Sequence, residues 1–125
     1  MDTQSMNTLQ QTHTAVWNET DRTTRDSLMQ TIYADDINMY DKDFTLTGIA
    51  AVSDFIDKLF TGDTNFTFTA SKPMESTQNG ARLYWDIRTG PQPNVLTGMD
   101  FFVVENEKVA HLFVFMDAQQ KVTTR

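Results

Sequence analysis

The acid at position 100 lies in a stretch of sequence that is otherwise strongly apolar. Residues 97–104 alternate as a β-strand does, which places Asp100 on the same face as Phe102 and Val104. If that face points inward, burial disfavours the charged carboxylate, and a neutral carboxylic acid can donate a hydrogen bond to a reacting oxygen. If the face points outward, Asp100 pairs with a surface base such as Arg88. The pattern alone leaves both interpretations open.

A second acid, Asp41, follows the short strand predicted over residues 37–40. The preceding Asp35 and Asp36 are interpreted as solvated residues that cap the turn between a helix and this strand. An isolated aspartate after a strand is usually a turn residue. Asp41 becomes a candidate general base only if it faces Asp100 across a cavity, because a base must reach the molecule that it deprotonates.

The composition narrows the class of protein. The chain has 125 residues, enough for a single domain over 1–125 that needs no disulfide or metal to fold. It has no cysteine, which excludes disulfides, zinc–thiolate sites and thiol nucleophiles. Its net charge is −7 without a basic stripe, which argues against binding to nucleic acid or to anionic membranes. His13 and His111 are too few and too far apart for an obvious metal site, and we expect no cofactor.

Two features bear on localisation. The N-terminal residues have neither a basic start nor an apolar core, so no signal peptide is expected. No apolar run approaches the ~20 residues that a membrane-spanning helix needs. We therefore expect a cytoplasmic protein.

The secondary structure that must position the two acids is predicted to change from mainly helices to strands near residue 63. Apolar residues before this point recur at helical spacing, and those after it mostly alternate. Helices are predicted at about 4–19, from an N-cap at Asp21 to about 34, and from 49 to Gly62. Strands are predicted around 66–68, 81–88, 95–104 and 109–116, with turns at 90–94 and 106–107. The fold class is α+β, with three N-terminal helices packed on a strongly curved antiparallel sheet around a central pocket.

Short segments spread over nearly the whole chain have a characteristic order and spacing. They are Ala15–Asp21, Arg25, Tyr33–Asp36, Gly48, Leu83–Trp85, Gly98–Phe101, Lys108–Val109 and Phe115–Asp117. Together they resemble the SnoaL-like branch of the NTF2-like superfamily, which implies a cone-shaped fold. The superfamily includes ketosteroid isomerases, polyketide cyclases, epoxide hydrolases, dehydratases and non-catalytic members. The fold therefore does not fix the function.

Within this superfamily, the pattern of the ketosteroid isomerases can be laid on the chain. It implies that Asp41 is the general base and Asp100 the acid that holds an oxyanion. Trp17 falls where those enzymes have a tyrosine. An indole N–H can donate one hydrogen bond, but it cannot act as an acid in the way a phenol does. The resemblance thus implies a pocket with polar ends and puts steroid isomerisation itself in doubt.

The same alignment with the ketosteroid isomerase pattern assigns residues to the two faces of the sheet. The pocket wall is expected to consist of Leu83, Trp85, Ile87, Gly98, Phe102, Leu112, Val114 and Met116, with Trp17 opposite them. The outward face is expected to carry Tyr84, Arg88, Phe101, Val103, His111, Phe113 and Phe115. That face is too apolar for a monomer, so we expect a homodimer through it. His111 would then lie at the rim or interface. His13 could line the cavity mouth, although a purely structural role is favoured.

Two kinds of function remain open. One is a cofactor-free isomerase, cyclase, dehydratase or hydrolase that acts on a small apolar molecule with a carbonyl or epoxide group. In it, Asp41 moves a proton, and Asp100 with the Trp17 N–H binds the developing oxyanion. The alternative is a non-catalytic module for small-ligand binding or dimerisation. The missing tyrosine favours the module, and the pair of acids favours chemistry.

Overall fold

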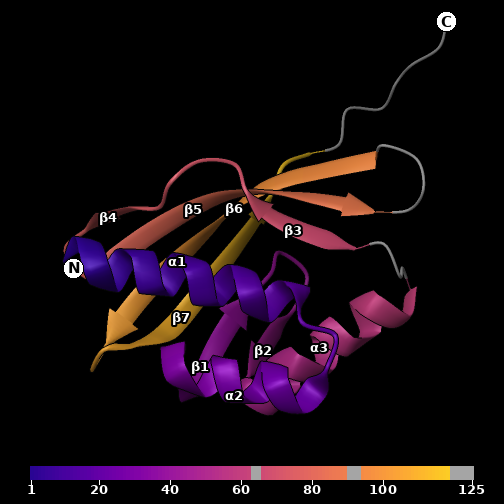
Figure 1. Ribbon diagram of the computed structural model, residues 1–125, viewed down its shortest axis with the longest axis horizontal. Helices are drawn as coiled ribbons and strands as arrows, with labels where there is room; N and C mark the ends of the chain where they lie inside the picture. The colour runs from indigo at the N-terminus through magenta and orange to yellow at the C-terminus, as the bar shows by residue number, and fades with distance from the viewer. Residues whose placement is uncertain (63–65, 90–93, 119–125) are drawn as a thin grey trace, which may run out of the picture.

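The computed structural model describes residues 1–62, 66–89 and 94–118 (Figure 1). Over these residues it contains three helices followed by, and partly interleaved with, the strands of one seven-stranded sheet. The α+β class and the three N-terminal helices are confirmed. The predicted turn at 90–94 lies almost entirely outside the described residues.

The helices begin where side chains can satisfy free backbone N–H groups. Helix α1 (Thr3–Asn18) is capped by Asp2, whose carboxylate accepts from the Ser5 N–H at 2.7 Å. Helix α2 (Arg22–Ile32) is capped by Asp21, as predicted, through the Thr24 N–H at 2.9 Å. Helix α3 (Ile49–Gly62) follows Gly48, whose φ of 95° a residue with a side chain rarely adopts. Among the described residues, none of these helices is long and apolar enough to cross a membrane.

The sheet has the strand order β2-β1-β7-β6-β5-β3, and β4 also pairs with β5. One edge is therefore β2, and the other is shared by β3 and β4, so the sheet does not close on itself. The strands are β1 (Tyr33–Tyr40), β2 (Thr45–Thr47), β3 (Thr67–Ala70), β4 (Glu75–Thr77), β5 (Gly80–Thr89), β6 (Asn94–Glu105) and β7 (Lys108–Met116).

The sheet is mixed rather than wholly antiparallel, because β1 runs parallel to β7. The other pairs are antiparallel, as predicted. A hairpin forces its two strands to run in opposite directions, but most of the chain separates β1 from β7, so no turn sets their relative direction. Asn106 and Glu107 form the predicted tight reversal between β6 and β7, with φ of 52° and 66°.

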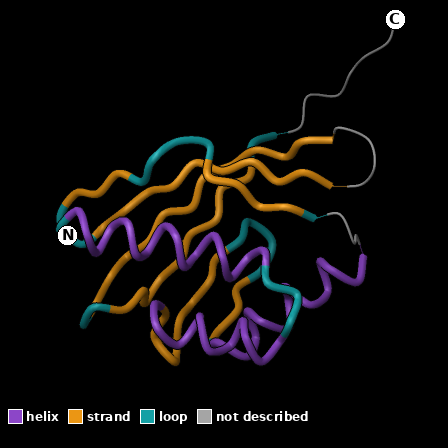
Figure 2. Tube along the Cα trace, in the orientation of Figure 1, coloured by secondary structure: helices purple, strands orange, loops and turns teal. Residues whose placement is uncertain are grey.

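The helices cover one face of the bent sheet. Figure 2 shows α1 crossing the long strands, while α2 and α3 gather near β1 and β2. On β6, Gly98, Asp100 and Phe102 are buried, whereas Met99 and Phe101 are only half-buried. The inward face of β6 is therefore the one that carries Asp100, which decides between the two interpretations of the sequence.

A buried arginine fastens α2 to α3. Arg25 is fully buried and donates to Ser53 Oγ at 2.9 Å, to the Glu19 carbonyl at 2.8 Å and to the Asp57 carboxylate. Each of the three guanidinium nitrogens thus donates to a group of α3 or of the loop before α2. The cluster holds α3 in place, and α3 supplies one wall of the cavity described next.

Candidate functional site

A cavity of about 170 Å³ lies between the helices and the inward face of the sheet. Side chains from α1, α3 and five strands or their ends line it, and all but two of them are apolar or aromatic. They are Trp17, Met39, Asp41, Phe55, Leu59, Phe66, Phe68, Trp85, Ile87, Leu96, Asp100, Val114 and Met116. An apolar protein cavity of ~150 Å³ can hold a benzene molecule. This cavity therefore suits a single small ring rather than a polycyclic molecule.

The structure brings most of the predicted site residues together at this cavity. Both acids line it, as do five of the residues predicted for its wall, namely Trp17, Trp85, Ile87, Val114 and Met116. Leu83, Phe102 and Leu112 are fully buried but do not line it. At their end of the sheet α1 fills the space, and His13 packs edge-on against Phe102 with ring centroids 4.7 Å apart.

Asp100 is buried, with 3% of its surface exposed, and both carboxylate oxygens have partners. The Trp85 indole N–H donates to Oδ1 at 3.0 Å, and His13 Nε2 lies 2.8 Å from Oδ2. Trp85 can reach Asp100 because its cross-strand neighbour is Gly98, where a Cβ atom would lie 2.4 Å from the indole ring. Glycine at 98 thus makes room for the ring that braces the acid.

The network continues from His13 to Tyr33, the first residue of β1. His13 Nδ1 is hydrogen-bonded to the Tyr33 hydroxyl, and the Trp17 indole N–H donates to the same hydroxyl oxygen at 3.3 Å. His13 is fully buried and Tyr33 nearly so. Burial raises the pKa of the Tyr33 phenol above its ordinary value, so Tyr33 keeps its proton as a donor.

One arrangement of protons gives every N–H and O–H of this network an acceptor within it. The two indoles can only donate, so Tyr33 accepts from Trp17 and Asp100 accepts from Trp85. Tyr33 then donates to His13 Nδ1, and a neutral imidazole donates from Nε2 to an ionised Asp100. If Asp100 were instead the donor to His13 Nε2, the ring proton would lie on Nδ1. Nδ1 could then not accept from Tyr33, and the Tyr33 proton would have no acceptor in the network. In this arrangement Asp100 is an acceptor rather than the neutral donor that was expected.

The same network corrects the expected role of Trp17. Its N–H is bonded to Tyr33 rather than facing the cavity, so only its ring surface meets a ligand. The indole that contacts Asp100 is Trp85 instead. The cross-strand pattern places Trp85 and Asp100 on one face, but it does not show which of the two indoles reaches the acid.

Asp41 lies at the half-buried rim of the cavity. Its Oδ1 accepts from the Asp43 N–H at 3.1 Å, and its own N–H donates to the Phe44 carbonyl at 2.9 Å. Its carboxylate is thus held by a turn and retains acceptor capacity toward the cavity. Asp35 and Asp36 are exposed, as the sequence predicted, but they lie within β1 and do not cap a turn.

The sequence favours a structural role for His13 and assigns no role to Tyr33, yet both belong to the network at Asp100. His13 occupies the buried stripe of α1 between Leu9 and Val16, a position where an imidazole needs a polar partner. That requirement is the signal in the sequence, but the partner lies 87 residues away. Arg82 and Arg88 are exposed, and Arg82 pairs with Glu75. In the described cavity wall there is accordingly no arginine for a carboxylate–arginine–carboxylate relay.

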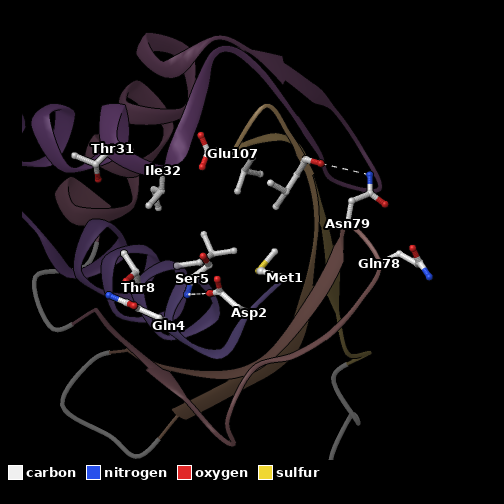
Figure 3. Close-up of a pocket in the computed structure, with 13 residues that line it drawn as sticks. Met1, Asp2, Gln4, Ser5, Thr8, Thr31, Ile32, Gln78, Asn79 and Glu107 are labelled. Carbon is white, nitrogen blue, oxygen red and sulfur yellow. Dashed lines mark hydrogen bonds between the residues drawn. The ribbon is translucent and has the colours of Figure 1, made fainter.

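A larger and more open hollow of about 570 Å³ lies at the other end of α1 (Figure 3). Its acids, Asp2 and Glu107, are exposed, and Asp2 is engaged in capping α1 through Ser5. Across residues 1–62, 66–89 and 94–118, no group of three or more His, Asp or Glu side chains could hold a metal ion. The cavity at Asp100 is therefore the candidate site.

Comparison with known proteins places this architecture in a family. The model of the SnoaL-like domain matches residues 11–112. No curated protein matches the chain.

Among solved structures, a candidate isomerase of the SnoaL-like family from Agrobacterium tumefaciens aligns with a TM-score of 0.82 at 21% identity, over 92% of this chain and 99% of that one. An NTF2-like protein of unknown function from Exiguobacterium aligns with a TM-score of 0.72 at 18% identity, over 90% and 99%. A candidate SnoaL-like polyketide cyclase from Jannaschia aligns with a TM-score of 0.72 at 11% identity, over 94% and 90%. The family match over most of the chain and the shared fold show that this chain belongs to the SnoaL-like domain family, within the NTF2-like fold.

Proposed function

We propose that the domain binds a small, mostly apolar molecule in the cavity and that Asp100 removes a proton from it, as in a cofactor-independent isomerase, cyclase or dehydratase. The observation that carries this proposal is a buried carboxylate in the wall of an apolar cavity, with both oxygens fixed by His13 and Trp85. A general base must be held within reach of the proton it takes and kept out of bulk water. Asp100 lines the cavity and is almost fully buried, which supports this role.

The hydrogen-bond network is compatible with transient protonation of Asp100. A proton taken from the ligand would bond to the cavity-facing lone pair of an Asp100 oxygen, leaving the ligand with the electron pair. His13 and Trp85 can go on donating to the two oxygens, so the network need not rearrange. Return of the proton to a different atom of the ligand completes an isomerisation. Asp41, at the rim, is placed to exchange protons between the cavity and solvent.

One observation favours the non-catalytic alternative, a small-ligand-binding module. The N–H donors among the described side chains of the wall are the indoles of Trp17 and Trp85, and both are engaged inside the protein. No donor of the described wall side chains is thus left over for a developing oxyanion, on which most enolate chemistry depends. A protein that only holds its ligand needs no such donor. The absence of cysteine fits the cytoplasm, which we propose as its location.

Proton exchange separates the two functions without knowledge of the substrate. A panel of cyclic ketones and lactones of about the size of benzene is incubated with the protein in D₂O, and deuterium uptake next to the carbonyl is followed by NMR. The catalytic proposal expects uptake with the unmodified protein and with Asp86→Asn, which changes a half-buried acid on the outward face. It expects loss of uptake in Asp100→Asn with the far-UV circular dichroism unchanged. Binding without uptake in any variant would leave the binding module as the function.

A further inference from the structure

We infer that the cavity selects a small organic cation, an apolar body of about the size of benzene that carries an amine or quaternary ammonium group. This inference rests on the proposed function, because it names the class of molecule that the same cavity takes. Two independent properties of the wall point to it, namely an uncompensated negative charge and a lining of aromatic faces.

The first property is charge. The wall holds two carboxylates, Asp41 and Asp100. The partners of Asp100 are an indole and an imidazole, and the imidazole is neutral in the arrangement that gives every N–H and O–H of the network an acceptor. The carboxylate of Asp41 accepts from a backbone N–H.

The basic side chains of the described residues do not balance this charge. No Lys or Arg of the described residues lines the cavity, and the arginines with hydrogen bonds donate elsewhere: Arg22 and Arg25 to acids of α2 and α3, and Arg82 to Glu75. A neutral ligand would displace water from Asp41 and bring no charge to either carboxylate. A cation would offset that cost directly.

The second property is the aromatic lining. Trp17 stands next to Phe55 and Phe68 with ring centroids 6.3 Å away in each case, and Phe68 stands 5.8 Å from Trp85. These four rings, with Phe66, form much of the wall. Aromatic faces attract ammonium groups, most strongly where water is excluded. The methyl groups of an alkylammonium also match the apolar surface between the rings, so one ligand satisfies both properties of the wall.

The two acids differ in how a cation would meet them. Both oxygens of Asp100 already have a hydrogen-bond partner, whereas the Asp41 carboxylate accepts one hydrogen bond from its own turn and lies at the rim. We therefore assign the charge of the ligand to the Asp41 end and its proton-losing part to Asp100. Under this assignment Asp41 determines specificity and Asp100 determines reactivity.

A matched pair of probes tests the inference. Choline carries a trimethylammonium group, and 3,3-dimethylbutan-1-ol is its neutral isostere. Binding is followed by intrinsic fluorescence, since the two tryptophans of the chain, Trp17 and Trp85, both line the cavity, and it is checked by calorimetry. We expect choline to bind at least about tenfold more tightly than the alcohol. Asp41→Asn should remove most of that preference without weakening the alcohol, while Asp43→Asn, an exposed neighbour with the same change of charge, should retain it.

Equal binding of the two probes, tighter binding of the alcohol, or no choline binding at millimolar concentration would overturn the inference. So would a preference that survives in both Asp41→Asn and Asp100→Asn. These failures are separate from failure of the proposed function. If neutral ketones bind and exchange deuterium while choline does not bind, the proposal of a general base is supported and the preference for a cation is rejected. If choline binds selectively but no probe exchanges deuterium, the cavity is a cation-binding site without the catalytic step.

Discussion

At the scale of single residues, the problem that the protein solves is how to keep a carboxylate inside an apolar wall. Burying a charge without partners is costly, and a carboxylate is usually stabilised by an arginine or lysine. Here the side-chain partners of Asp100 are neither arginine nor lysine but Trp85 and His13. In the arrangement with a neutral His13, the acid keeps its negative charge available to a ligand.

His13 should be a major contributor to stability as well as to the position of Asp100. His13→Leu leaves an oxygen of Asp100 and the hydroxyl of Tyr33 without their buried partner. We expect the free energy of unfolding in urea to fall by roughly 2–4 kcal/mol. The matched change His111→Leu, at a half-buried histidine of the outward face, should cost less than about 1 kcal/mol. Equal losses in the two variants would show that the His13 contacts contribute little.

Gly98 should be intolerant of even the smallest side chain. A Cβ atom there would lie 2.4 Å from the Trp85 ring and 2.5 Å from the Phe115 carbonyl oxygen. We expect Gly98→Ala to displace the indole, to shift the tryptophan emission and to destabilise the fold by roughly 1–3 kcal/mol. Gly80→Ala is the control, because its new Cβ would meet the edge of the Phe101 ring, which can move on the outward face. An unchanged emission spectrum in Gly98→Ala would contradict the bracing role of Trp85.

At the scale of elements, the position of α3 depends on charged side chains between α2 and α3. Hydrogen bonds from Arg25, and then from Arg22, hold the pKa of Asp57 below its ordinary value. Because the folded-state pKa is the lower one, the unfolded chain binds this proton more strongly. The stabilisation is therefore complete above the unfolded pKa of about 4 and is lost as the pH falls through the folded pKa.

Acid titration of stability tests this contribution. We expect the free energy of unfolding of the unmodified protein to decrease as the pH is lowered below about 4. In Asp57→Asn the decrease should be shallower, because that variant has already lost the titrating group. Urea denaturation between pH 7 and pH 2.5 measures both slopes. Slopes that coincide would mean that the exposed part of the pair is screened by solvent and contributes nothing measurable.

Some of the helices and strands could be predicted from the sequence and others could not, and the reasons can be identified. The three helices and the four longer strands have enough residues for their apolar spacing to be recognised. Strands β2 and β4 have three residues each, too few to show alternation. Residues 33–34 were expected in a helix but begin β1, where pairing with β7 overrides the local preference. Alternation places Asp100 on one face with Phe102 and Val104 but leaves open whether that face points inward. The hydrogen bond between Asp100 and His13 was not predictable, because it joins distant segments.

At the scale of the whole molecule, the outward face of the sheet remains to be explained. Phe113 stacks on Tyr40 with ring centroids 4.5 Å apart and lies 6.4 Å from Phe101, and Phe115 is 55% exposed. Tyr84 lies on the same face, beneath the Lys72 ammonium. We propose that this face forms a homodimer, because a contiguous aromatic surface is unfavourable in water.

Sedimentation velocity at micromolar concentration tests the dimer. We expect the unmodified protein to sediment as a dimer and Phe113→Asp to sediment as a monomer or to aggregate. Thr45→Asp adds the same charge at an exposed position of edge strand β2 and should remain dimeric. A monomeric unmodified protein would mean that the aromatic face is not an interface between copies of this chain.

The account depends most on the claim that Asp100 is an ionised acceptor which the protein does not neutralise. Side-chain ¹⁵N NMR of the histidines measures this directly, and the chain has only two, which a His111 variant distinguishes. We expect His13 at pH 7 to be neutral, with its proton on Nε2 toward Asp100 and with Nδ1 accepting from Tyr33. An imidazolium at His13, or a neutral ring protonated on Nδ1, would contradict the account. Asp100 would then be either paired with a buried cation or itself protonated, and it could not be the base at the centre of the cavity.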